Sequence, residues 1–66
     1  MKIKWINKYS NESGFVKHVD YKKHHFVNTF NESEAKKYAS EESAKKTIAK
    51  LIEYGEGENN NFIIVA

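Results

Sequence analysis

The sequence predicts a single α+β domain over residues 1–66: a four-stranded, mainly antiparallel sheet with two consecutive helices packed on one face. Three observations lead to this class. Residues 2–9 alternate between apolar and charged side chains, residues 15–19 and 25–30 are rich in aromatic and β-branched residues, and residues 44–52 carry apolar side chains at helical intervals. A period of two indicates a half-buried strand, whereas intervals of three and four indicate an amphipathic helix. The expected order of elements is βββ-αα-β.

The first three strands are expected to form an antiparallel meander. In the first, Ile3, Trp5 and Tyr9 share one face, and lysines occupy the other. The polar residues 10–14, which end in glycine, connect this strand to the second, and residues 20–23 form the next turn. Such short connections favour neighbouring antiparallel strands.

The second strand has two possible registers. One turns Phe15 and Val19 toward the core, which also buries Lys17, and the other buries Val16 and His18. Because side chains alternate along a strand, a shift of one residue exchanges the two faces completely. The sequence leaves both registers open.

The helical part begins at Asn31, which forms a capping box with Glu34 and so predicts a short first helix. Ser40 caps a second, longer helix with an apolar stripe that runs to about Tyr54. Two helices are expected because one straight helix would point the apolar residues of the two segments to opposite sides. Gly55 is the expected stop of the second helix.

Residues 62–65 predict a last strand after a polar loop. Their apolar run is continuous, which favours a central position in the sheet. The neighbour of this strand stays open, although pairing with the first strand would place both chain ends in one sheet. The predicted core consists of Ile3, Trp5, Phe26, Phe30, Tyr38, Ala44, Ile48, Leu51, Ile52, Ile63 and Val65.

No residue pattern in the chain indicates catalysis, and we expect no enzymatic activity, no cofactor and no metal. The absence of cysteine excludes disulfides and thiolate zinc sites. His24 and His25 are adjacent, so in a strand they would point to opposite faces and could not bind one ion together. The three glycines are too scattered for a phosphate-binding loop.

Charge is distributed unevenly between the two halves of the chain. Residues 1–30 carry six lysines against Glu12 and Asp20, whereas residues 31–66 carry five lysines against seven glutamates. The first half is therefore basic and the second mildly acidic, a field that steers partners. No apolar run reaches the ~20 residues of a membrane span. With no leader at the start of the sequence, we expect a cytoplasmic protein without membrane contact.

The strands carry apolar residues on both faces, yet the helices can cover only one. An exposed apolar surface rimmed by charge is typical of a protein contact, so we expect a binding surface on the uncovered face and its turns. The alternative is a nucleic-acid binder that uses the same lysines and aromatic rings. The candidate contact residues are Lys2, Lys4, Ile6, Lys8, Tyr21, Lys22 and Lys23.

The segment from Glu34 to Tyr38, the Ser40–Ala44 motif and the terminal β-branched strand together resemble small accessory proteins of phages and mobile elements of low-GC Gram-positive bacteria. The resemblance implies binding to host or phage macromolecules, for example inhibition of a defence nuclease as by anti-CRISPR proteins. The expected function is thus a non-enzymatic inhibitor or modulator of a host machine that acts by surface occlusion in the host cytoplasm. Its partner would be a host protein or a protein–nucleic acid complex, and the chain itself a monomer or homodimer.

Overall fold

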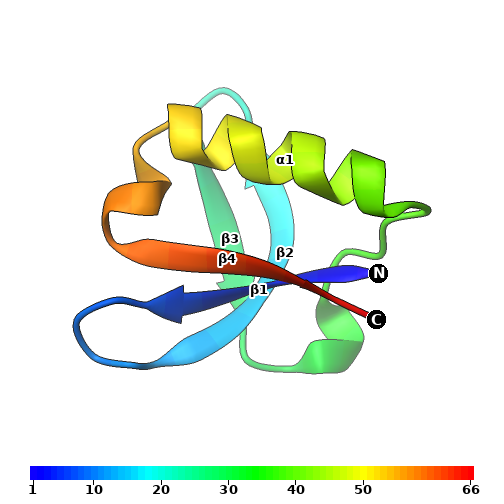
Figure 1. Cartoon of the computed structure of the whole chain (residues 1–66), viewed down its shortest axis with the longest axis horizontal. Coiled ribbons are helices and arrows are strands. Elements are labelled where there is room, and N and C mark those ends of the chain that lie inside the picture. The colour runs from blue at the N-terminus through cyan, green and yellow to red at the C-terminus, as the bar shows by residue number, and fades with distance from the viewer.

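The computed structural model of residues 1–66 is a twisted antiparallel sheet with one α-helix lying across a single face (Figure 1). The sheet order is β3-β2-β1-β4, so the first and last strands are neighbours and the two chain ends lie close together. The α+β class and the antiparallel meander are confirmed. The elements are β1 (Lys2–Asn7), β2 (Ser13–Asp20), β3 (His25–Thr29), the 3-10 turn η1 (Glu32–Glu34), the helix α1 (Glu41–Glu53), the 3-10 turn η2 (Glu56–Glu58) and β4 (Asn60–Val65).

The prediction of two consecutive helices is wrong, because the observed order is βββ-α-β. After the single turn of η1, Ala35 has an extended backbone with ψ of 143°. The following residues bond to distant backbone instead of continuing a helix. The N–H of Lys36 donates to the carbonyl of Val16 at 3.0 Å, and the N–H of Tyr38 donates to the carbonyl of Met1 at 2.7 Å. These bonds hold the segment in an extended form.

The longer helix forms as its sequence predicts. The Ser40 hydroxyl accepts a hydrogen bond from the N–H of Ser43, satisfying one of the free donors at the start of α1. The first-turn glutamates face the positive end of the helix dipole. Gly55, with φ of 92°, follows the helix in the left-handed conformation, which confirms it as the stop.

A β-bulge decides the register of β2. The pairing with β3 shifts between Val16 and His18, so one extra residue stands on β2 at this point. Both Val16 and Val19 consequently face α1, whereas Phe15 and His18 face the other side. Neither of the two regular registers holds along the whole strand.

The core lies between α1 and the sheet. Five buried residues form its centre: Ile3, Val16, Tyr38, Ala44 and Leu51. Half-buried side chains surround them, namely Val19, Phe26, Ile48, Phe62 and Ile64.

Several predicted core residues lie outside the core. Two of them belong to β4, which is an edge strand and not a central one. Its Phe62 and Ile64 face α1, whereas Ile63 and Val65 face away from the helix, and Ile63 is 43 % exposed. Ile52, at the side of α1, is 57 % exposed, and Phe30, beyond the end of β3, is 67 % exposed. Ile3, Trp5, Tyr38, Ala44 and Leu51 are buried as predicted.

Candidate functional site

The face of the sheet opposite α1, here called the outer face, carries a mixture of apolar and basic side chains. One row crosses all four strands, because Lys4 of β1 stands between Phe15 of β2 and Ile63 of β4, and Phe15 pairs with Thr29 of β3. The strand registers and the alternation of side chains place these residues on the outer face: Lys2, Lys4, Ile6, Ser13, Phe15, His18, Val27, Thr29, Asn61, Ile63 and Val65.

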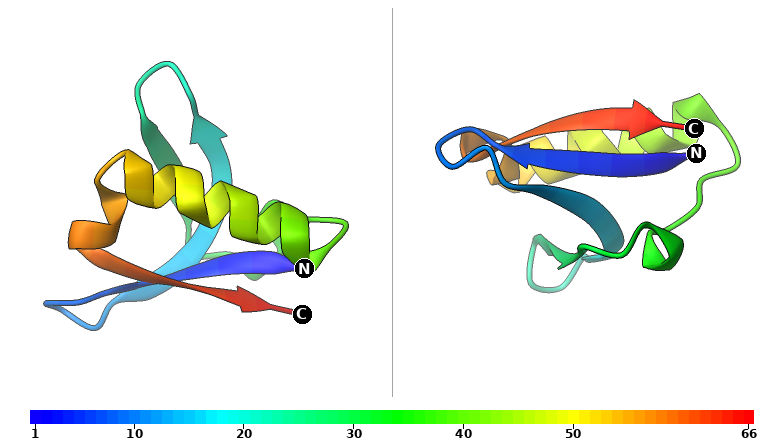
Figure 2. Two further views of the ribbon diagram at one scale, coloured as in Figure 1. Left: turned by 45° about the horizontal axis from the view of Figure 1, so that its top comes forward. Right: turned by 90° about the horizontal axis from the view of Figure 1, so that it is seen from below.

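The outer face carries the apolar side chains of Ile6, Phe15 and Ile63 around Lys4 and is not covered by a helix. Ile6 and Phe15 are half-buried by their neighbours on the sheet, and Ile63 is more exposed. Only η1 lies against this side, at the end where β3 finishes (Figure 2). The expected uncovered apolar face is therefore present in the fold.

The turn η1 neutralises some of the basic charge at that end. Lys2 forms an ion pair with Glu32, with Nζ and Oε2 3.1 Å apart, and Lys17 lies 3.5 Å from a carboxylate oxygen of Glu34. Lys4, by contrast, has no carboxylate within ion-pair distance. The free cation of the outer face is thus Lys4, at the centre of its apolar row.

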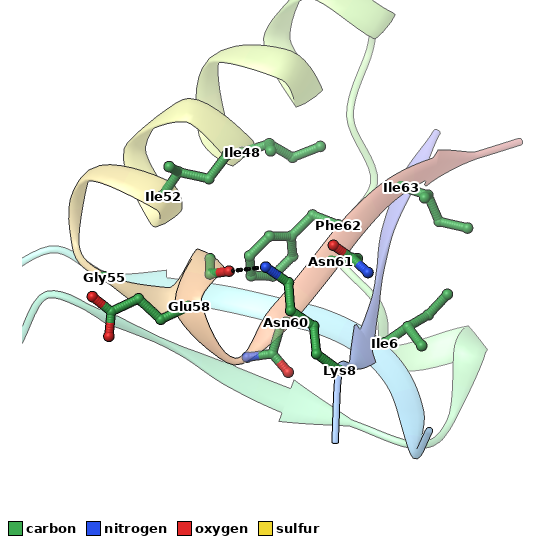
Figure 3. A pocket seen from close by; sticks show the side chains of 11 residues that line it. Ile6, Lys8, Ile48, Ile52, Gly55, Glu58, Asn60, Asn61, Phe62 and Ile63 are labelled. Carbon is green, nitrogen blue, oxygen red and sulfur yellow. Dashed lines mark hydrogen bonds between the residues drawn. The ribbon is translucent and has the colours of Figure 1, made fainter. Parts of the chain in front are cut away.

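Lys8 stands at the border between the outer face and an open groove at the sheet edge. Its Nζ donates to the carbonyl of Gly57 at 2.7 Å and so ties the end of β1 to η2 (Figure 3). The groove has a volume of about 710 Å³ and is formed by the side of α1, the turn η2 and β4. Its apolar side chains are Ile6, Ile48, Ile52, Phe62 and Ile63.

Sequence reasoning missed this groove. Ile52 and Ile63 are both predicted core residues, and the apolar stripe of the helix does not reveal that its last member, Ile52, is mostly exposed. The only available signal was the density of apolar residues, which exceeds what one small core can bury.

The turn residues Tyr21, Lys22 and Lys23 do not join the outer face. The β2–β3 turn extends toward the helix side of the sheet and reaches the C-terminal end of α1 (Figure 2). There the ring of His24 stacks on Tyr54 with centroids 4.6 Å apart, and Tyr21 meets Tyr54 edge-on at 6.4 Å. The seven predicted contact residues are therefore split between two sides of the molecule.

Asp20 holds this turn in shape. Its carboxylate accepts hydrogen bonds from the N–H groups of Lys22 and Lys23 at 3.1 and 3.0 Å. The bond from Lys23 is the main reason why the pKa of Asp20 lies below its ordinary value, and the nearby charge of His25 acts in the same direction. The turn is thus held by two hydrogen bonds and carries two lysines.

The titratable side chains of the fold do not gather into a cluster of metal-binding character. No group of three or more His, Cys, Asp or Glu side chains is placed to hold a metal ion. The indole N–H of Trp5 and the hydroxyl of Tyr38 are buried without hydrogen-bond partners, but both are closed off in the packed interior. No helix has the length and apolar character that crossing a membrane requires.

Comparison of the chain with models of known protein families, with curated proteins and with solved structures found no match.

Proposed function

We propose that this chain is a non-enzymatic interaction protein that binds a macromolecular partner through the outer face of its sheet. One observation carries the proposal: the row of Phe15, Lys4 and Ile63 lies on a face that no helix covers. Apolar side chains around a single free cation suit a protein contact, since interface centres carry few charges. Binding of a partner to this face needs no cofactor, because it depends only on contact between the two surfaces.

The arrangement of lysines favours a protein over a nucleic acid as partner. Phosphate backbones are bound by several cations placed along one surface. Here Lys2 and Lys17 are paired with glutamates of η1, and Lys22 and Lys23 lie on the opposite side. Inhibition of a host machine, such as a defence nuclease, is the role that the phage-type resemblance adds to this proposal.

Affinity capture tests the proposal. The tagged chain is incubated with lysate of a low-GC Gram-positive bacterium, with and without nuclease, and the captured proteins are identified and their affinity measured with purified components. A double variant, Lys4→Glu with Ile6→Ser, is expected to weaken binding at least about tenfold, because residues at an interface centre contribute most of its energy. The control Lys46→Glu makes the same charge change on the exposed side of α1, where Lys46 is 79 % exposed.

Two results contradict the proposal. The first is unchanged affinity of the double variant when its circular dichroism spectrum matches that of the wild type, which excludes the outer face. The second is loss of the partner on nuclease treatment, together with direct binding to nucleic-acid probes that falls steeply with salt. That result assigns the chain to nucleic-acid binding.

A further inference from the structure

The strand β4 has an unpaired edge. Along the β1–β4 pair, the N–H of Lys8 donates to the carbonyl of Asn59 at 2.8 Å. Because hydrogen-bonded pairs alternate in an antiparallel ladder, every second residue of β4 is bonded to β1 and the residues between them are not. The N–H and C=O groups of Phe62 and Ile64 therefore point away from the sheet.

This edge lacks the features that normally protect one. Natural edge strands carry charged residues, proline or bulges, or are covered by another element. The residues of β4, Asn60–Val65, include no charge and no proline, and the strand pairs regularly with β1 throughout. In the sheet order β3-β2-β1-β4 no strand of the chain follows β4. The edge is open to a further strand.

Apolar side chains flank the open edge on both faces of the sheet. On the helix side, Ile48, Ile52 and Phe62 line the groove, and on the outer side Ile63 is exposed (Figure 3). A strand added at β4 would gain main-chain hydrogen bonds and would also cover these side chains. This is the arrangement used in recognition by strand addition.

We propose that β4 pairs antiparallel with β4 of a second copy of this chain, which gives a two-fold symmetric dimer with a continuous eight-stranded sheet. The free groups restrict the register, since only residues with outward-pointing N–H and C=O can form bonded pairs. Within this limit, an axis at Ile63 brings the exposed Ile63 side chains of the two copies together. With the axis at Ile63, Phe62 bonds to Ile64 of the second copy, and Ile63 faces its own equivalent. Every side chain of this segment then meets an uncharged one.

The positions of the charges and the spacing of the helices are both compatible with a second copy at this edge. The Lys4 side chains of the two copies would be three strand spacings, about 14 Å, apart, which is beyond the Debye length of ~8 Å at physiological salt. The helix α1 packs over both β1 and β4. Two such helices would lie two strand spacings, about 10 Å, apart, which matches the usual separation of packed helices. Ile52 would then be covered by the second copy.

The oligomeric state tests the proposal directly. The dimer has twice the chain mass of 7.7 kDa. Sedimentation or light scattering at chain concentrations up to about 1 mM detects a dimer even when its dissociation constant is as high as that concentration. The substitution Ile63→Lys places two cations opposite each other at the axis and is expected to raise the dissociation constant at least about tenfold. The control Val27→Lys puts the same charge on the outer face of the other edge strand and should leave the dimer intact.

Amide hydrogen exchange reports on the backbone bonds themselves and does not depend on a variant that folds. In the dimer the N–H groups of Phe62 and Ile64 should exchange slowly, and on dilution they should exchange at least about tenfold faster, in step with dissociation. The N–H of Ile63, which faces β1, should be protected at all concentrations. The proposal is overturned if the chain stays monomeric at about 1 mM or forms an open-ended assembly. It is also overturned by a dimer that Ile63→Lys does not weaken, or by a dimer in which Phe62 and Ile64 exchange fast.

Discussion

The indole ring of Trp5 fills the space above Gly14, so that a Cβ atom at Gly14 would lie only 2.8 Å from Cζ2 of the ring. The two residues are directly opposite each other on β1 and β2. By lying flat over this glycine, the ring reaches across β2 and meets Phe26 and Phe30, at centroid distances of 6.5 and 6.0 Å. The absence of a side chain at Gly14 thus allows the aromatic cluster to form.

Gly14→Ala is therefore expected to destabilise the fold by about 1–3 kcal/mol, the usual cost of forcing extra volume into a packed interior. Urea unfolding followed by circular dichroism measures the change. Gly57→Ala is the matched control: its Cβ would lie 3.2 Å from Cγ1 of Ile52, whose exposed side chain is free to move. Equal stability of the two variants would show that the Trp5 ring has room to shift.

The parts of the fold that the sequence predicted are those fixed by local patterns. Alternation in β1 and the serine cap and glycine stop of α1 act within a few residues, and they form as expected. The missing first helix shows the limit of such signals. Asn31 does cap η1, since its side chain accepts a hydrogen bond from the N–H of Ser33. The same capping sequence can start a single turn or a full helix, so it does not predict the length of the element. The bonds from Lys36 to Val16 of β2 and from Tyr38 to Met1 decide the outcome.

The candidate site was predictable in part. Alternation placed Lys2, Lys4 and Ile6 together on one face of β1. The position of Tyr21 depends on its contact with Tyr54, 33 residues further along the chain, and no local pattern predicts such a contact. The continuous apolar run of β4 predicts a central strand, but such a run arises equally on an edge strand with apolar residues on both faces.

Gly55 follows α1 with φ of 92°, and no atom lies within 4 Å of the position that its Cβ would take. A substitution there meets backbone strain alone. Gly55→Ala is expected to lower the free energy of unfolding by about 1 kcal/mol, whereas Gly55→Asn should lower it less because asparagine tolerates the left-handed region better. Thermal unfolding of both variants measures the difference, and alanine equal to wild type would contradict the assigned conformation.

The carboxylate of Asp20 should titrate below its ordinary pKa of 3.8, because it accepts hydrogen bonds from the N–H groups of Lys23 and Lys22. A lowered pKa in the folded state means that this contribution to stability is present above pH 3.8 and is lost as the pH falls through the lower value. NMR titration of the side chain measures the pKa. In Asp20→Asn the turn should keep its shape but lose this acid dependence, whereas Asp20→Ala should loosen the turn at every pH.

Burial raises the pKa of the Tyr38 hydroxyl above its ordinary value of 10.0, and the charge of Tyr21 adds to the effect. The Thr47 hydroxyl is near enough to oppose the rise, but it donates to the carbonyl of Ser43 and leaves the Tyr38 hydroxyl without a hydrogen-bond partner. The neutral phenol is therefore the form that the fold favours.

The sign of the pH dependence follows from this shift. Above pH 10 the unfolded chain loses the Tyr38 proton while the folded chain keeps it, so this contribution is complete below pH 10 and is lost as the pH rises further. Tyr38→Phe should remove that part of the alkaline loss. At pH 7 it should be neutral or stabilising by up to about 1 kcal/mol, since it deletes an unpaired buried hydroxyl. Urea midpoints between pH 7 and 11 measure both effects. Tyr9→Phe, at a side chain that is 80 % exposed, is the control, and an equal alkaline loss in the two variants would mean that Tyr38 ionises freely in the folded protein.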